Sequence, residues 1–393
     1  MAFLPPPPGA LTRSAHRALC LPPPWRPHGR DDHDNQPVSP PPSSAVAAPI
    51  DGDALLARVL PGPDRLSFLH NQSTAAVKDS HAGAVIAAAL TTHTGRLVDV
   101  VALVVAAHEV LVVGSPSMGE ALMARFDKYL FPGDEVELAD VTGAYTLTAL
   151  LGGGVAEHLT AAGAGGGSGG SLPGEGAWVP LDADAAAAAA PRAAGEPWLA
   201  GTAVLAGSSL GVPGVRLLTR VRAADAGGGG SDITAGLPML TAAEVAALRV
   251  WAGVPAAGAE ITDAANPLDA RLWAAVSWDK GCYLGQETIA RLRTYDGVRM
   301  ALYGVDVAAP VGEGVVAGDA VHLRDAADSD KPAGVVTSVV SLVGGGAWAL
   351  AYLRVKGGAA APGVAVLVGK ERAPAVVRDI VHASSPPPRP PSK

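Results

Sequence analysis

WDKGCYLGQETIAR, residues 278–291, is the run from which the rest of the sequence is best interpreted. Glu287 precedes Arg291 by four residues, the order and spacing that favour an ion pair along a helix. A helix is therefore expected to begin just after Gly285. Cys282 then lies in a glycine-flanked turn immediately before the N-terminus of that helix.

The thiol of Cys282 has the sequence surroundings of a reactive cysteine. The dipole of the following helix and the nearby Lys280 both favour the thiolate form. The alternative is a buried structural cysteine, because free cysteines are among the most buried residues in proteins. No histidine is close to Cys282 in the sequence, so a protease-like Cys–His pair is not predicted.

The cysteine count argues against a disulfide and against a resident metal centre. The chain has two cysteines, and loss of Cys20 with a presequence would leave Cys282 without a partner, which suits a reducing compartment. One thiolate cannot hold an iron–sulfur cluster alone, since such clusters normally take about four protein ligands. Zinc-binding spacings do not occur, and no metal site is expected.

Composition restricts the class of protein. The 393 residues suffice for two or three domains of roughly 100–200 residues each, and 49% of them are apolar. The formal net charge of −8 argues against non-specific nucleic-acid binding, which usually requires a basic surface. No segment reaches the roughly 18 consecutive apolar residues of a membrane span. Neither nucleic acid nor a membrane is an expected partner.

The N-terminus has the composition of a targeting sequence. Residues 1–30 contain four arginines and no acidic residue. Such a segment is typical of an organelle transit peptide, and the Met1-Ala2 start with abundant proline favours a chloroplast, with a mitochondrion as the alternative. A disordered tail without a targeting role would have a similar composition. Ordered structure is expected to begin near Asp51.

Helix signals recur along the chain. Helices are predicted after three potential N-caps, Asp64, Ser115 and Thr241. Glu244 completes a capping box at the third of them. A fourth helical face is indicated by Leu268, Leu272 and Val276.

Strand signals occur between and after these helices. Runs that are rich in valine or alternate in hydrophobicity predict strands over residues 96–106, 110–114, 135–141 and 145–151. Low-complexity inserts, interpreted as flexible loops, follow over residues 163–176, 185–190 and 227–230. Beyond Arg291 short Val-rich strands with Gly and Pro turns predict a small β-barrel. The expected fold class is α+β.

The run Lys280-Gly281-Cys282-Tyr283-Leu284-Gly285-Gln286-Glu287 resembles the signature of the YgfZ family. These are folate-binding proteins of iron–sulfur cluster assembly or repair, structurally related to the aminomethyltransferase (T protein) of glycine cleavage. Further blocks similar to the family occur in the family's order: DRLSFLHNQST at 64–74, GRLVD at 95–99, Leu248-Arg249 before Gly253 and Pro255, Pro267-Leu268, GVVTS at 334–338 and Leu350-Ala351-Tyr352. Residues 131–142 and 288–297 are most similar to plastid-type members.

The resemblance implies a three-lobed ring, built from two α+β lobes and a C-terminal β-barrel around a hole that accepts tetrahydrofolate or a one-carbon derivative. The domains would be a presequence and Pro-rich linker (1–49), an aminomethyltransferase-like folate-binding region (50–290), the barrel (291–383) and a disordered tail (384–393). The resemblance further implies Cys282 and Lys280 as catalytic residues. The cofactor-binding residues would be Asp99, Arg249, Tyr283, Gln286, Glu287 and Arg291.

Several of these residues have simpler interpretations. Asp99 lies where T proteins carry an Asp-Asp pair, but its neighbour here is Val100, and it has the alternative of an ordinary strand-edge carboxylate. Arg249 could instead be an ordinary cation on a helix surface. Glu287 could instead serve only as the ion-pair partner of Arg291. The departure at Val100 makes lipoyl-borne aminomethyl transfer an unfavoured activity.

Two function hypotheses follow from the resemblance. The first is a tetrahydrofolate-binding factor that supports iron–sulfur cluster assembly or repair, with the assembly machinery or client cluster proteins as partners and Cys282 acting on sulfur. The second is a folate-dependent one-carbon or aminomethyl transferase. A folate-binding module without chemistry is a third possibility, and it would require Cys282 to be dispensable.

Overall fold

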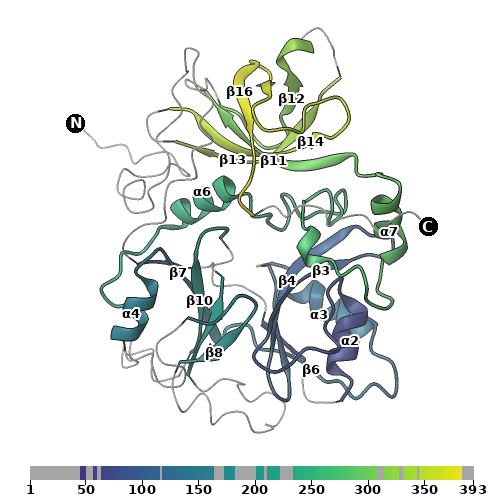
Figure 1. Ribbon diagram of the computed structural model, residues 1–393, viewed down its shortest axis with the longest axis vertical. Helices are drawn as coiled ribbons and strands as arrows, with labels where there is room; N and C mark the ends of the chain where they lie inside the picture. Colours follow the sequence, from purple (N-terminus) through teal and green to yellow (C-terminus); the bar gives the residue numbers. More distant parts are fainter. Residues whose placement is uncertain are drawn as a thin grey trace.

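The computed structural model describes residues 45–49, 56–59, 63–115, 117–162, 172–181, 201–207, 210–221, 233–308, 314–326, 331–342 and 345–382. The described residues form two five-stranded antiparallel sheets and a closed β-barrel, with the barrel above the sheets in Figure 1. The presequence, the second and third low-complexity inserts and the C-terminal tail from residue 384 lie outside the described residues, as does most of the first insert. No helix in the described ranges is long and apolar enough to cross a membrane.

The first sheet carries two helices on one face. Its strand order is β3 (Val85–Thr91), β4 (Leu97–Val105), β5 (Val110–Val113), β2 (Leu56–Val59) and β6 (Leu138–Asp140). Helices α2 (Arg65–Gln72) and α3 (Gly119–Lys128) share one buried apolar cluster with this sheet. The rings of Phe68 and Phe126 meet edge to face within it, with 5.9 Å between centroids.

The second sheet packs against the first. Its strand order is β1 (Val46–Pro49), β7 (Tyr145–Leu151), β10 (Gly214–Arg220), β9 (Thr202–Ala206) and β8 (Trp178–Pro180), with α4 (Val155–Ala161) packed against its other face. Leu111 of β5 belongs to the same buried cluster as Leu147 and Leu205 of the second sheet. The two sheets therefore share an apolar interface, as in other two-layer packings.

Strand β1 corrects the expected start of ordered structure. We expected residues up to 49 to form a linker, but Val46–Pro49 pairs antiparallel with β7. The N–H of Leu240 donates to the carbonyl of Ala47, and the N–H of Ala47 donates to the carbonyl of Pro238. The small side chains of Ala47 and Ala48 are fully buried, so this Ala-rich segment is part of the core.

The C-terminal barrel is confirmed. Its closed strand order is β11 (Met300–Val307), β14 (Ala347–Arg354), β13 (Gly334–Ser341), β12 (Ala320–Leu323), β15 (Ala365–Val368) and β16 (Ala373–Arg378), and a short 3₁₀ turn η3 (Arg324–Ala326) follows β12. The expected boundary at residue 291 is wrong by several residues, because it falls inside α7 (Gln286–Thr294). The helix ends where Asp296 takes a left-handed conformation and Gly297 donates to the carbonyl of Leu292.

The helix caps were predicted with mixed success. Helix α6 (Ala242–Ala252) begins with the expected capping box between Thr241 and Glu244. Asp64 makes no side-chain cap on α2, and its Oδ2 accepts instead from the N–H of Glu135. Helix α3 begins at Gly119, after the expected position, because the Ser115 hydroxyl is bonded elsewhere.

The helix expected around Leu268, Leu272 and Val276 is wrong. Within the segment from Leu268 to Val276, the only regular element is a short 3₁₀ helix, η2 (Trp273–Ala275). Asn266 Oδ1 accepts from the N–H groups of Leu268 and Asp269, at 2.9 and 3.0 Å. These bonds cap a single turn, which does not continue because Arg271 takes a left-handed conformation with a φ of +58°. The three apolar side chains are nevertheless buried, so burial here does not depend on a helical face.

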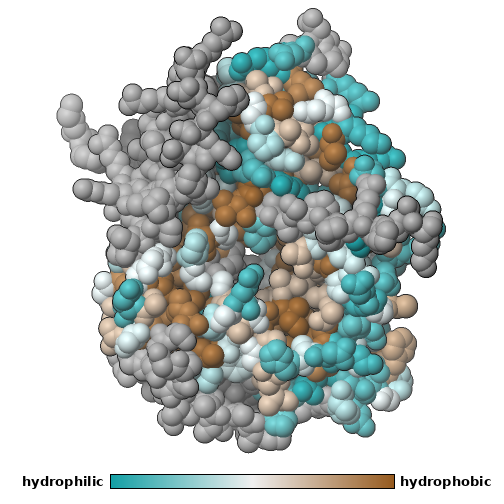
Figure 2. All heavy atoms as spheres, in the orientation of Figure 1, coloured by the Kyte–Doolittle hydropathy of each residue, from teal (hydrophilic) through white to brown (hydrophobic). Residues whose placement is uncertain are grey.

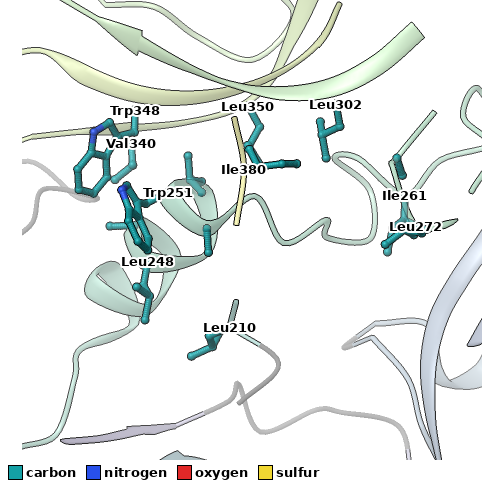
Figure 3. Close-up of a cluster of buried hydrophobic side chains, with 14 of the residues drawn as sticks. Leu210, Leu248, Trp251, Ile261, Leu272, Leu302, Val340, Trp348, Leu350 and Ile380 are labelled. Atoms are coloured by element: carbon teal, nitrogen blue, oxygen red, sulfur yellow. The ribbon is translucent and has the colours of Figure 1, made fainter. Parts of the chain in front are cut away.

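Helix α6 joins the second sheet to the barrel. Leu248 and Trp251 of the helix lie in one buried cluster with Trp348 of β14 and Ile380 (Figure 3). The two tryptophan rings are 6.4 Å apart between centroids. Large aromatic side chains of this kind contribute much of the burial energy at a junction.

A buried ion pair fastens the same junction. Glu260 is completely buried, and its Oε2 lies 3.0 Å from Nη1 of Arg249 on α6. Its Oε1 accepts from the hydroxyls of Thr337 and Ser338 on β13, each at 2.6 Å. Tyr352 of β14 donates its hydroxyl to the Glu260 backbone carbonyl at 2.8 Å. Through its carboxylate and its backbone carbonyl, Glu260 thus links α6, the segment that follows the helix and two barrel strands.

Replacement of Arg249 by methionine should destabilise the protein by about 3–5 kcal/mol, because it leaves the Glu260 carboxylate buried without its cation. Arg291→Met is the control, since it breaks the exposed Glu287–Arg291 pair and should cost below about 1 kcal/mol. Denaturant unfolding of both variants measures the difference. Equal losses in the two variants would contradict the assigned role of Glu260.

Candidate functional site

The run that contains Cys282 forms a loop between η2 and α7, and four long-range hydrogen bonds hold it against α2, the segment after α2 and strand β3. Ser277 donates its N–H to Thr74, and the carbonyl of Leu284 accepts from the Thr91 hydroxyl at 2.6 Å. Lys280 Nζ donates to the Ser73 carbonyl at 2.7 Å and also to the His70 carbonyl. The loop is therefore fixed by backbone groups and not by its own regular structure.

Gly285 allows the loop to approach the turn between β3 and β4. Its φ of +84° is left-handed, and an added Cβ would stand 2.5 Å from the Thr92 carbonyl oxygen and 2.7 Å from the Cα of Gly95. Both features exclude a larger side chain at this position. Gly285 is also the residue before α7, so the same conformation sets the direction in which the helix leaves the loop.

Cys282 is an exposed free thiol. The alternative of a buried structural cysteine is therefore excluded. The helix after it begins at Gln286, as the run predicted, so the thiol stands just ahead of the helix N-terminus.

Lys280 holds the loop on α2. The carbonyls that its ammonium contacts belong to the C-terminal end of that helix, where a cation is electrostatically favoured. The ammonium also lies 4.8 Å from the centroid of the Tyr283 ring. Burial lowers the pKa of Lys280 to about 8. Its donors are thus directed at the protein, which makes it a positioning residue in this arrangement.

His70 is a site residue that the sequence did not reveal. Its Nδ1 accepts from the N–H groups of Val77 and Lys78, both at 3.2 Å, so the ring proton belongs on Nε2. Nε2 faces the loop and would lie 3.8 Å from a Cβ on Gly281, the neighbour of Cys282. Burial and the charge of Lys280 lower the pKa of His70. The neutral ring therefore presents an N–H donor to the loop.

The sequence separation between His70 and Cys282 explains why the pair was missed. His70 lies inside the DRLSFLHNQST block of the family resemblance, which was the available signal. The structure brings α2 beside the loop, and the surface around α2 is mostly hydrophilic on the face shown in Figure 2.

Tyr283 is a packing residue in this structure. It is buried with Leu268, Val276 and Ile289, and burial raises the pKa of its hydroxyl to about 12. Its ring covers the Lys280 ammonium, so it shields the contacts that hold the loop.

The other predicted residues of the run lie on α7. Glu287 and Arg291 form the expected ion pair at 2.6 Å, with both side chains more than two-thirds exposed. Gln286 is half-buried at the start of the helix. These side chains are available to a ligand from solvent, and the ion pair is of the kind that contributes little to stability.

Asp99 is engaged within the first sheet. It has no exposed surface, and its oxygens accept from the hydroxyl and N–H of Ser115 and from the N–H of Val100 at 2.6–2.9 Å. Burial raises the pKa of Asp99, and these hydrogen bonds oppose the shift. The carboxylate fixes the chain between β5 and α3, and it is not the strand-edge group considered as an alternative.

Arg249 is likewise bonded inside the protein. Besides Glu260, its guanidinium donates to the Val254 carbonyl and to the Ser338 hydroxyl, both at 2.9 Å. It is therefore not a free helix-surface cation. The structure thus brings Lys280, Cys282 and Tyr283 together with His70, and it leaves Asp99 and Arg249 in separate networks.

Comparison with known proteins relates the fold to aminomethyltransferases. No protein-family model matches the chain. The glycine cleavage system aminomethyltransferase T from Bartonella henselae superposes with a TM-score of 0.65 and 19% identity, over 86% of this chain and 85% of that one. The fold resembles that of T protein. This confirms the expected relation in fold, whereas the three-lobed count stays a prediction.

One curated relative is similar in sequence. A chloroplastic protein from Arabidopsis thaliana that carries a provisional transferase name is 31% identical over 251 residues, which are 63% of this chain. This chain spans about half of that protein, since the match covers 54% of it.

Gly285→Ala should destabilise the protein by more than about 2 kcal/mol, because the left-handed conformation and the contact with Thr92 and Gly95 both oppose a Cβ. Gly143→Ala is the matched control: its φ is +83° and nothing lies within 4 Å of the added atom, so only about 1 kcal/mol is expected. Thermal unfolding of the two variants tests the contact. Similar losses would show that the approach of the loop to the β3–β4 turn is unimportant.

Proposed function

We propose that this chain is a tetrahydrofolate-binding protein that supports iron–sulfur cluster assembly or repair in an organelle, with Cys282 as its functional thiol. The observation that carries the proposal is the exposed thiol in a YgfZ-like run, presented on a T-protein-like fold. The fold supports folate as the ligand, and the run supports the assembly or repair role.

The surroundings of Cys282 suit sulfur transfer. His70 offers an N–H to the loop, and Lys280 contributes positive charge two residues from the thiol. Neither group is arranged to accept a proton near Gly281, which argues against general-base chemistry by either of them. In the simplest step, the Cys282 thiolate attacks the outer sulfur of a persulfide donor. The S–S bond breaks, the donor leaves as a thiolate, and Cys282 carries the new persulfide.

A second candidate is a folate-dependent one-carbon transferase. The transferase name of the Arabidopsis relative and the likeness to aminomethyltransferase T support it. The arrangement of Asp99 argues against it, because the carboxylate would have to release Ser115 before it could orient a ligand. We therefore propose that Gln286, Glu287 and Arg291 on α7 contact the folate, in preference to Asp99 and Arg249.

Purified protein should bind tetrahydrofolate with micromolar affinity, about −8 kcal/mol, as measured by calorimetry. Cys282→Ser should bind equally well, because the thiol acts on sulfur and not on the folate. Absence of binding in both proteins would remove the folate part of the proposal.

Loss of the chromosomal gene should lower the activities of iron–sulfur enzymes in the organelle, and the wild-type chain should restore them. Cys282→Ser should restore little or none of this activity. Asp279→Asn, an exposed change in the same loop, is the matched control and should restore activity in full. Full rescue by Cys282→Ser would refute the functional thiol and favour the transferase or a pure folate-binding module.

Residues 1–45 fused to a fluorescent reporter should direct it to chloroplasts, because the segment is basic, free of acidic residues before Asp31, and rich in proline. Microscopy of plant cells measures the location, with the unfused reporter as control. Diffuse cytosolic fluorescence would contradict an organelle address, and a mitochondrial signal would select the alternative compartment.

A further inference from the structure

A cavity of about 700 Å³ opens beside α7, away from the thiol loop. Its walls come from the β3–β4 turn, the segment around Asn266, α7 and the start of the barrel. They comprise Thr94, Arg96, Ala264, Asn266, Asp269, Thr288, Arg291, Leu292, Tyr295, Asp296, Gly297, Arg299, Met300 and Lys356. The volume is that of a small-molecule site, and four of the lining residues, Arg96, Arg291, Arg299 and Lys356, are cationic. This lining suits the charged part of a ligand.

Two of the cations in this lining are uncompensated. Arg291 is paired with Glu287, and Arg96 donates to the Ala264 carbonyl near Asp269. Arg299 and Lys356 have no side-chain partner within the ranges that the structure describes, and both are exposed. The N–H of Val355 donates to the Arg299 carbonyl at 2.9 Å, so the backbone segments that carry the two cations are adjacent.

The acidic groups of the cavity do not cancel this charge. The Asp269 carboxylate accepts from the backbone and side chain of Asn266, and burial raises its pKa. Asp296 has partners of its own at the end of α7. Hydroxyl and amide donors from Thr94, Thr288 and Asn266 complete the lining. Cations and neutral donors together are what clustered carboxylates or phosphates require.

We propose that this cavity binds a ligand segment with two or more adjacent anionic groups, held by Arg299 and Lys356. A single anion would not use the volume, and a neutral ligand would leave both cations unsatisfied. The shared chemistry is that of an oligocarboxylate or an oligophosphate chain. The proposal does not require that the protein binds folate, although a γ-linked glutamate chain on a folate would be one source of such a segment.

The test is calorimetric titration of the full-length protein with two probes, a γ-linked triglutamate peptide and inorganic tripolyphosphate. The wild type should bind at least one of them. Binding of the triglutamate alone identifies a carboxylate chain, and binding of tripolyphosphate alone identifies a phosphate chain. The double variant Arg299→Ala/Lys356→Ala should bind at least about a hundredfold more weakly, since each charge-assisted contact accounts for about tenfold.

The matched control is Arg324→Ala/Lys370→Ala, which removes the same charge from exposed barrel positions outside the cavity. It should bind like the wild type. Lack of binding of both probes to the wild type, or an equal loss in the control, overturns the proposal. Affinity for monoglutamyl tetrahydrofolate, measured in parallel, reports on the proposed function separately, since either result can be obtained without the other.

Discussion

A carboxylate without access to water must be paired with a cation or hydrogen-bond donors, and Glu260 is such a carboxylate in this fold. Its partners come from α6, from the turn that follows the helix and from β13, so satisfying one side chain fixes the barrel on the second sheet. The apolar contacts between Trp251 and Trp348 add energy at the same junction but specify its geometry less narrowly. The segment that leaves Glu260 leads through η2 to the thiol loop. Its starting point is therefore set by this pair, which also directs three of the five Arg249 N–H donors into the protein.

The loop that carries Cys282 is rigid without regular secondary structure. Contacts to backbone atoms far away in the chain hold it, through Lys280, Leu284 and Gly285. Such contacts leave Cys282 exposed, while its neighbour Gly281 lies beside Nε2 of His70. Upstream of the loop, the expected helix is cut short because Arg271 takes a left-handed conformation, with a φ of +58°, after the turn that Asn266 caps.

A structural feature could be predicted from the sequence where the interacting residues lie close together in the chain, and not where they lie far apart. Patterns that are satisfied locally were readable: the capping box of Thr241, the Glu287–Arg291 pair and the short Val-rich strands of the barrel. Interactions with distant partners were not. Ser115 has the chemistry of an N-cap, but its hydroxyl is used by Asp99 on another strand, and Asp64 is used by Glu135. His70 could not be connected with Cys282 by spacing, because only the packing of α2 on the loop brings them together.

The cavity and the thiol loop both adjoin one element, α7, and this bears on how a ligand would be used. Cys282 stands before the helix begins, whereas Thr288, Arg291 and Tyr295 line the cavity along its length. The β3–β4 turn touches both, through the contact of Gly95 with Gly285 and Thr288. A ligand that fills the cavity would therefore also border Thr94 and Arg96 of this turn. The thiol loop thus meets this turn at Gly285 and the cavity meets it at Thr94 and Arg96, so a single turn borders both.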